Sequence, residues 1–179
     1  MDSCARPFAH SPTQSRNVVP VTLQNLKERA VENADRTLRV LFLCTGNSCR
    51  SQMAEGWAKH LKAGQIEAYS AGTEPHGLNP LAVRAMGEVG IDISGHTSKR
   101  PEEIGVEFDY VVTVCDSAHE SCPIFPARTR VIHVGFDDPP RLAKGAASDE
   151  EAMPHYRRVR DEIKSFVQTL PESLSIRKA

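Results

Sequence analysis

The chain has 179 residues, with 22 lysines and arginines against 23 aspartates and glutamates, and a formal net charge of −1. This length suits one well-cored domain and is too short for two large ones. Balanced charge excludes a strongly basic surface for nucleic acid or an anionic membrane, and no apolar stretch approaches the length of a membrane span. Because no secretory signal is visible either, we expect a cytoplasmic monomer without nucleic-acid or membrane partners.

The N-terminal part of the chain differs in composition from the rest. Residues 1–20 are rich in Pro, Ser and other polar types, whereas 21–34 carry apolar residues at helical spacing. We therefore expect an N-terminal extension over 1–36 that is partly disordered and contains a short amphipathic helix. A folded domain is expected over 37–172, followed by a tail at 173–179.

From residue 38 onward, apolar strand patterns alternate with amphipathic helical patterns. Strands are expected at 38–43, 66–71, 109–114 and 130–134, and helices at 52–63, at 79–89 and in a C-terminal stretch that begins around Pro154. Such alternation is typical of parallel strands joined by helical crossovers. We predict a single α/β domain with a central four-stranded parallel sheet flanked by helices, and binding groups at the carboxyl ends of the strands.

The strongest functional signal is a turn of small polar residues between the first strand and the first helix of this domain. The turn reads Cys44, Thr45, Gly46, Asn47, Ser48, Cys49, Arg50, Ser51. Its small residues tolerate the backbone angles that turn N–H groups inward, and the following helix N-terminus adds partial positive charge. Arg50 suits a tetrahedral oxyanion, and positive potential should favour the thiolate of Cys44. Either residue alone is usually structural, but together in this order they predict sulfur attack on a bound oxyanion.

Two further cysteines, Cys115 and Cys122, follow the third predicted strand. In a fully formed helix they would share one face but lie roughly 10 Å apart along the axis, whereas a disulfide needs Cα atoms within about 7 Å. A bond between them therefore requires a change of shape. They could be ordinary thiols, and His119 lies between them without zinc-site spacing, so no metal is expected. Beside a reactive Cys44, a redox use is favoured, because a second thiol can expel the product of a sulfur adduct.

Taken together, these motifs resemble the thioredoxin-coupled arsenate reductases, which share the low-molecular-weight tyrosine phosphatase fold. The matching segments are 44–56, 69–73, 90–94, 113–115, 122–123 and 135–139, within about residues 38 to 170. The combination is highly specific. It implies an enzyme of arsenical resistance that needs no cofactor and that retains some phosphatase activity.

The resemblance also implies roles in the oxyanion step. Cys44 would attack arsenate while Arg50 and the loop N–H groups hold its oxygens, and Asp138 would protonate the departing hydroxyl. Asp137 is the less favoured acid. Ser51 would orient the Cys44 thiolate by a hydrogen bond, and it could at the same time cap the following helix.

For the redox step, the resemblance implies a relay. Cys115 would attack Cys44 and release arsenite, and Cys122 would then attack Cys115, leaving a Cys115–Cys122 disulfide for thioredoxin to reduce. Cys49 has no step in this relay and is interpreted as structural. Cys4, in the extension, has no counterpart in the family.

Some members of the family bind a potassium ion beside the loop, and this chain matches that site only in part. Asn47, Glu55 and Ser70 correspond to ligands, but Lys99 stands where a carboxylate would be expected. The Lys99 ammonium could take the place of the cation and pair with Glu55. We therefore predict weak or absent dependence on potassium.

Three alternatives stay open. The first is a low-molecular-weight protein tyrosine phosphatase acting through a cysteinyl-phosphate, although Gln52 stands where phosphatases usually carry Pro, and Pro140 where they usually carry an aromatic residue. The second is a non-catalytic oxyanion or redox sensor. The third concerns the electron donor, since related reductases use glutaredoxin with glutathione, or mycothiol.

Overall fold

The computed structural model describes residues 36–176, and the described residues from 37 onward form one compact unit. The amphipathic helix expected within 21–34, and the disorder expected around it, lie outside the described residues.

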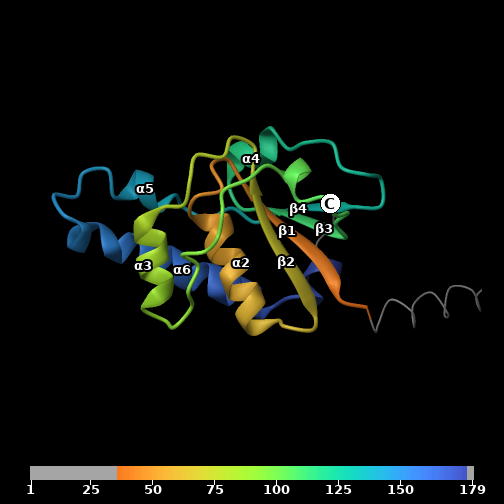
Figure 1. Cartoon of the computed structure of the whole chain (residues 1–179), viewed down its shortest axis with the longest axis horizontal. Helices are drawn as coiled ribbons and strands as arrows, with labels where there is room; N and C mark the ends of the chain where they lie inside the picture. Colours follow the sequence, from red (N-terminus) through yellow and green to blue (C-terminus); the bar gives the residue numbers. More distant parts are fainter. Residues whose placement is uncertain (1–35, 177–179) are drawn as a thin grey trace, which may run out of the picture. The chain divides into compact units, whose positions relative to one another are not determined.

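A four-stranded parallel sheet forms the centre of this unit, which confirms the predicted fold class. Its strands are β1 (Leu38–Cys44), β2 (Ile66–Gly72), β3 (Tyr110–Thr113) and β4 (Arg130–His133), in the spatial order β2-β1-β3-β4. The register aligns Cys44 with Gly72, and Thr113 with both Leu43 and His133. All four strands therefore end at the same edge of the sheet (Figure 1).

Three longer helices and four short ones connect the strands and follow them in the described chain. They are α2 (Arg50–Leu61), α3 (Pro80–Gly87), η1 (Pro101–Glu103), α4 (Asp116–Glu120), α5 (Pro139–Leu142), α6 (Asp149–Gln168) and α7 (Glu172–Ile176). α2 packs on β1, β2 and α6, and α6 also contacts α3 and α5. Figure 1 shows α4 at the carboxyl ends of the strands.

The core explains why β1 is apolar from Val40 to its end. Val40, Leu41, Phe42 and Leu43 are all fully buried, as expected for a central parallel strand that is covered on both faces. The apolar stripes of α2 and α6 meet beneath it, and Trp57 of α2 donates a hydrogen bond from Nε1 to a backbone oxygen of α6 at 3.2 Å. The strand that presents the loop is thus fully buried in the core and packs against α2.

Two expectations for the C-terminal part are corrected. The last long helix begins at Asp149 rather than near Pro154, because Ser148 caps it and accepts a hydrogen bond from the amide of Glu151 at 3.3 Å. Pro154 lies inside the helix, in its second turn, where its own side chain is exposed while the adjacent Met153 is buried in the core. The expected tail also starts with structure, since Leu174 of α7 is fully buried.

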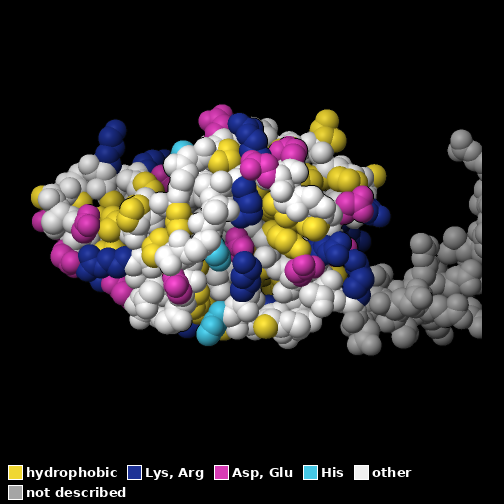
Figure 2. Space-filling view, in the orientation of Figure 1, with side chains coloured by type: hydrophobic (Ala, Val, Ile, Leu, Met, Phe, Trp, Pro, Cys, Tyr) yellow, Lys and Arg dark blue, Asp and Glu magenta, His cyan; other side chains and the backbone are white. Residues whose placement is uncertain are grey.

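The surface shows no single-sign region on the face that Figure 2 presents. There, acidic and basic side chains of the described residues are interspersed. Within residues 36–176, no helix combines the length and apolar character that crossing a bilayer requires.

Candidate active site

The turn between β1 and α2 is held open by a neighbouring segment, residues 73–79. The amides of Thr73, Glu74, His76 and Asn79 donate to the carbonyls of Cys44, Thr45, Gly46 and Ser48, at 3.2, 2.8, 3.1 and 2.9 Å respectively. In a trans peptide the carbonyl and the next N–H point in opposite directions. Because the carbonyls face residues 73–79, the N–H groups that follow them turn to the other side, which creates the anion-binding cradle.

Close backbone packing beneath the loop explains two residues of the sequence. A Cβ added at Gly72 would lie 2.5 Å from the carbonyl oxygen of Thr45 and 2.7 Å from the amide nitrogen of Asn47, so no side chain fits there. Asn47 itself has φ = 44°, in the left-handed region that asparagine tolerates better than most residues.

Cys44 ends β1 and is buried at the base of this cradle. Its sulfur lies 2.9 Å from Ser51 Oγ and 3.2 Å from the amide nitrogen of Asn47, which donates to it. Burial raises the pKa of Cys44 above its ordinary value, while hydrogen bonds from the Ser51 side chain and backbone lower it. The expected stabilisation of the Cys44 thiolate by positive potential is therefore offset by desolvation of the thiolate. Ser51 is not a helix cap, because Cys49 holds the N-cap position of α2.

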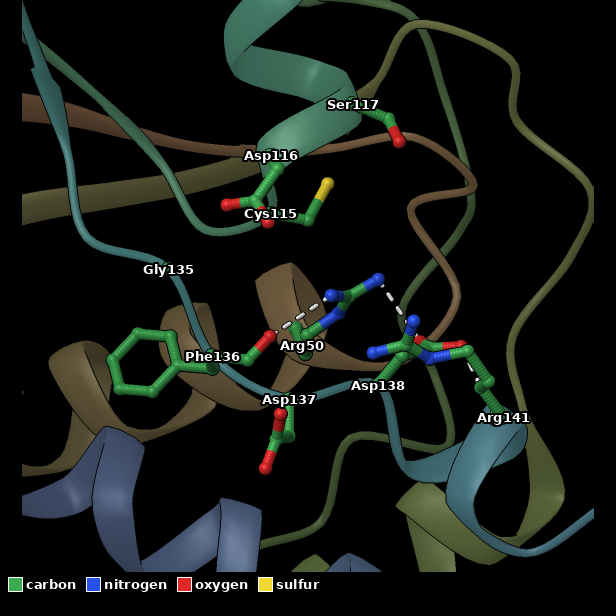
Figure 3. A pocket seen from close by; sticks show the side chains of 9 residues that line it. All are labelled: Arg50, Cys115, Asp116, Ser117, Gly135, Phe136, Asp137, Asp138 and Arg141. Atoms are coloured by element: carbon green, nitrogen blue, oxygen red, sulfur yellow. Dashed lines mark hydrogen bonds and ion pairs between the residues drawn. The ribbon is translucent and has the colours of Figure 1, made fainter.

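Arg50 is engaged by groups from the β4–α5 connection (Figure 3). Its Nη2 lies 2.9 Å from Asp138 Oδ1, and its Nη1 donates to the carbonyl of Phe136 at 3.0 Å. An incoming oxyanion must therefore compete with Asp138 for the guanidinium. Asp137 turns away from Arg50 and pairs with Arg158 at 2.8 Å, and that hydrogen bond lowers the pKa of Asp137.

Two adjoining cavities meet at this ion pair. One, of about 290 Å³, is lined by residues that include Cys44, Gly46, His76, Asp138 and Pro140. The other, of about 410 Å³, is lined by Cys115 together with Asp116, Phe136 and Arg141 (Figure 3). Arg50, Ser117 and Asp138 line both. The two cysteines thus face neighbouring spaces, and Thr45 joins them, since its Oγ1 lies 3.5 Å from the sulfur of Cys115.

The third cysteine lies beyond α4. Cys115 is the N-cap residue of this short helix and is buried, whereas Cys122 follows its C-cap and is half-buried. Burial raises the pKa of Cys122. Cys49 is buried beside the nucleophile, and burial raises its pKa strongly.

A chain of buried polar groups connects Cys44 to the Glu55 carboxylate in α2. Asn47 Nδ2 donates to Ser51 Oγ at 3.0 Å and to Ser70 Oγ at 2.9 Å, and Ser70 in turn donates to Glu55 Oε2 at 2.5 Å. Ser51 then meets the sulfur of Cys44. Within residues 36–176, no buried side-chain nitrogen or oxygen lacks a partner.

In the structure, the residues of this network are engaged by other protein groups. The predicted pairing of Lys99 with Glu55 is wrong, because Lys59 binds Glu55 Oε1 at 2.5 Å while Lys99 Nζ donates to the carbonyl of Thr97. Asn47 Oδ1 already accepts the amide of Lys99 at 2.9 Å. An ammonium thus sits on the carboxylate that would attract a potassium ion. Among residues 36–176, no group of three His, Cys, Asp or Glu side chains is arranged to hold a metal.

Several residues that shape the loop were missed from sequence. Ser98 Oγ donates to the carbonyls of Gly46 and Asn47, both at 2.9 Å, and Gln52 Nε2 donates to that of Asn47 at 3.0 Å. His76 lines the smaller cavity. One signal was available: a loop that turns its N–H groups inward must find partners for its carbonyls elsewhere in the chain.

Comparisons with known proteins agree with this geometry. A family model described as low molecular weight phosphotyrosine protein phosphatase matches residues 39–179. The arsenate reductase of Bacillus subtilis (strain 168) is 51% identical over 135 residues, covering 73% of this chain and 95% of that protein. A solved arsenate reductase in the phosphate binding state is 35% identical, with a TM-score of 0.58 over 75% of this chain and 96% of that one. A thioredoxin-dependent arsenate reductase of Corynebacterium glutamicum is 25% identical, with a TM-score of 0.56 over 86% and 70% of the two chains.

Proposed function

This chain belongs to the low molecular weight phosphotyrosine protein phosphatase family, and on that premise we propose that it reduces arsenate to arsenite through a relay of three cysteines. One observation carries the proposal. Cys44 and Cys115 line adjoining cavities that share the Arg50–Asp138 ion pair, and ester hydrolysis would have no use for the second thiol. The arsenate reductases among its relatives support the choice of oxyanion.

In the first step, the Cys44 thiolate attacks the arsenic atom of arsenate bound in the cradle. A hydroxyl of arsenate leaves as water with a proton from Asp138, which lines the same cavity. The loop N–H groups and Arg50 stabilise the charge on the remaining oxygens. The product is an arsenic(V) adduct on the sulfur of Cys44.

In the second step, the Cys115 thiolate attacks the sulfur of Cys44. A Cys44–Cys115 disulfide forms, the sulfur–arsenic bond breaks, and its electron pair stays on arsenic, which departs as arsenite. Cys122 then attacks Cys115, which frees Cys44 and leaves a Cys115–Cys122 disulfide. Because the five residues of α4 separate these two cysteines, that bond requires the helix to unwind.

Thioredoxin is the proposed donor of the two electrons. The surface next to Cys122 suits a protein reductant, since Ile124, two residues further on, is fully exposed. Three working thiols also require a reducing compartment, which fits the cytoplasm. Glutaredoxin and mycothiol are the competing donors.

The decisive experiment is arsenate-dependent NADPH consumption with thioredoxin and thioredoxin reductase, using Cys44→Ser, Cys115→Ser and Cys122→Ser. Each variant should lose at least about 100-fold of turnover, because each removes one transfer step. The control is Cys4→Ser, which should turn over like the parent chain. Thioredoxin-driven turnover that survives Cys122→Ser would break the relay, and repeating the assay with the other donors would identify the substitute.

Mass spectrometry after one arsenate turnover gives an independent measurement. The expected product carries a disulfide between Cys115 and Cys122, and the Cys122→Ser variant should instead accumulate Cys44 joined to Cys115. A protein that undergoes a single oxidation and never turns over repeatedly would be a sensor.

A phosphatase is the second candidate, because the family model carries that description. The same cradle could hold a phosphate ester, but Pro140 lines the cavity where an aromatic wall would favour a phosphotyrosine ring. We expect a generic aryl phosphate to be hydrolysed more slowly than arsenate is reduced. Faster hydrolysis would reverse the order of the two candidates.

A further inference from the structure

The side chain of His76 packs on the oxyanion loop, although none of the steps proposed above uses it. Its backbone amide donates to the carbonyl of Gly46 at 3.1 Å, which fixes where the side chain begins. The imidazole then folds over the same glycine. A Cβ added at Gly46 would lie 1.9 Å from Nε2, 2.5 Å from Cδ2 and 2.6 Å from Cε1. The Nε2 edge of the ring therefore rests on the loop itself.

Within residues 36–176, neither ring nitrogen of His76 has a hydrogen-bond or ion-pair partner. The ring lines the cavity that contains Cys44. Arg50 and His76 are the only residues in that lining able to carry positive charge, and Arg50 is already paired with Asp138. An exposed imidazole without a protein partner thus lines the cavity in which a tetrahedral anion would lie.

We propose that His76 is a further substrate-contacting residue, which donates a hydrogen bond from Nε2 to an oxygen of the bound oxyanion. The inference deepens the proposed function and rests on it for the identity of the anion. Three oxygens of an anion attacked by Cys44 face the loop and Arg50, and the fourth, which departs with a proton from Asp138, points away from the sulfur. His76, whose ring packs on Gly46 of the loop, contacts one of the three retained oxygens and so strengthens binding of the oxyanion.

The expected signature is a change in binding rather than in chemistry. A hydrogen bond to a charged group at a partly exposed site corresponds to roughly 10-fold in affinity. His76→Ala should therefore raise the KM for arsenate and the dissociation constant of inorganic phosphate together, each by about 10-fold. Because the contact exists before and during sulfur attack, kcat should change by less than about 3-fold.

A pair of conservative variants identifies the nitrogen responsible. The amide nitrogen of glutamine reaches about as far as Nε2, whereas that of asparagine reaches only about as far as Nδ1. His76→Gln should therefore recover most of the phosphate affinity that His76→Ala loses, and His76→Asn should not. The control is His60→Gln, an exposed histidine on α2 outside the cavity lining, which should bind phosphate like the parent chain.

Alkylation of Cys44 tests the inference without any turnover. Removing a donor that faces the anion should slow reaction with anionic iodoacetate more than reaction with neutral iodoacetamide, and it should weaken protection by phosphate. Equal slowing with both reagents, or phosphate binding within 2-fold of the parent chain in His76→Ala, would overturn the role. If the parent chain fails to reduce arsenate but this dependence on His76 persists, the proposed function fails while the anion contact stands.

Discussion

Among single residues, the balance of forces on Cys44 decides how reactive the site is. Burial disfavours its thiolate, whereas Ser51 and the amide of Asn47 stabilise it through hydrogen bonds. The neighbouring Asp138 pairs with Arg50 in the open site, and in the proposed mechanism it also supplies a proton once substrate is bound. Substitution of Asp138 or Arg50 should therefore change the affinity for the oxyanion and the rate of the chemical step to different extents.

Replacing Ser51 with alanine should make Cys44 less reactive. The change removes the 2.9 Å contact with the sulfur, so the pKa of Cys44 rises further and less thiolate is present at neutral pH. The iodoacetamide alkylation profile should move to higher pH, and the rate at pH 7 should fall by roughly 10-fold. Ser117→Ala, in the wall of the same cavity, should leave the midpoint of the pH profile of alkylation unchanged. An unmoved profile in Ser51→Ala would show that its hydroxyl does not stabilise the thiolate.

Asp138→Asn should bind oxyanions more tightly yet turn over more slowly. An amide competes less well for Arg50 and cannot donate a carboxylic proton, so the inhibition constant of phosphate should fall several-fold while kcat drops by about 100-fold. Steady-state kinetics with phosphate as inhibitor measures both. Asp137→Asn is the matched control, because Asp137 turns away to Arg158 and should alter neither value. An unchanged kcat in Asp138→Asn would exclude it as the acid.

Among the secondary-structure elements, the site is built by segments that follow different strands. The loop after β1 supplies the N–H groups, residues 73–79 after β2 hold its carbonyls, and α4 after β3 carries Cys115. The connection after β4 brings Asp138 to Arg50. α6 then supports the opposite side through its contact with α2. Stability of the site therefore depends on elements that never touch the substrate.

The capping of α6 provides a test of this dependence. Ser148→Ala removes the side chain that accepts the amide of Glu151, and it should cost about 1 kcal/mol of unfolding free energy, or roughly 2–4 °C in Tm. Thermal unfolding followed by circular dichroism measures the change. Ser165→Ala, on the exposed side of the same helix, should shift Tm by less than half as much. Equal shifts would mean that Ser148 does not act as a cap.

At the scale of the whole molecule, a lysine of the protein lies where an external potassium ion would otherwise balance the charge of Glu55. Lys59 and Glu55 form an ion pair that leads through Ser70 and Asn47 to the active site, so the protein carries its own positive charge there. The Glu55 carboxylate is almost fully shielded from solvent, whereas the Lys59 side chain is about half exposed (51%). In the structure, the Lys59 ammonium therefore balances the charge of this carboxylate from the solvent side.

Potassium should consequently have no specific effect. An ion that bound the folded state would raise Tm by mass action, so Tm and arsenate turnover should be equal in KCl and NaCl at the same ionic strength. A clear stimulation by KCl would contradict this. Lys59→Met removes the ammonium that pairs with the Glu55 carboxylate. This variant should have a lower Tm than the parent chain in both KCl and NaCl. Any dependence of Tm or turnover on potassium should appear in this variant and not in the parent chain.

Much of this arrangement could be predicted from the sequence because it is encoded locally. Buried strands are continuous apolar runs, and helices on the sheet carry apolar stripes, so the four strands and their parallel arrangement were recognisable. Their spatial order β2-β1-β3-β4 came only from the structure. The loop was recognisable because its residues are consecutive. The start of α6 was misplaced because Pro154 received more weight than the cap at Ser148, and the helix accommodates that exposed proline in its second turn.

The amino-acid order by itself determined the fold class and the position of the reactive loop, since both follow from local composition and periodicity. Only the tertiary structure decided which partners the loop obtains: residues 73–79 for its carbonyls, Asp138 for Arg50, and Lys59 rather than Lys99 for Glu55. These pairings depend on how strand ends align across the sheet and on which way side chains turn. Neither property is recorded in the spacing of residues along the chain.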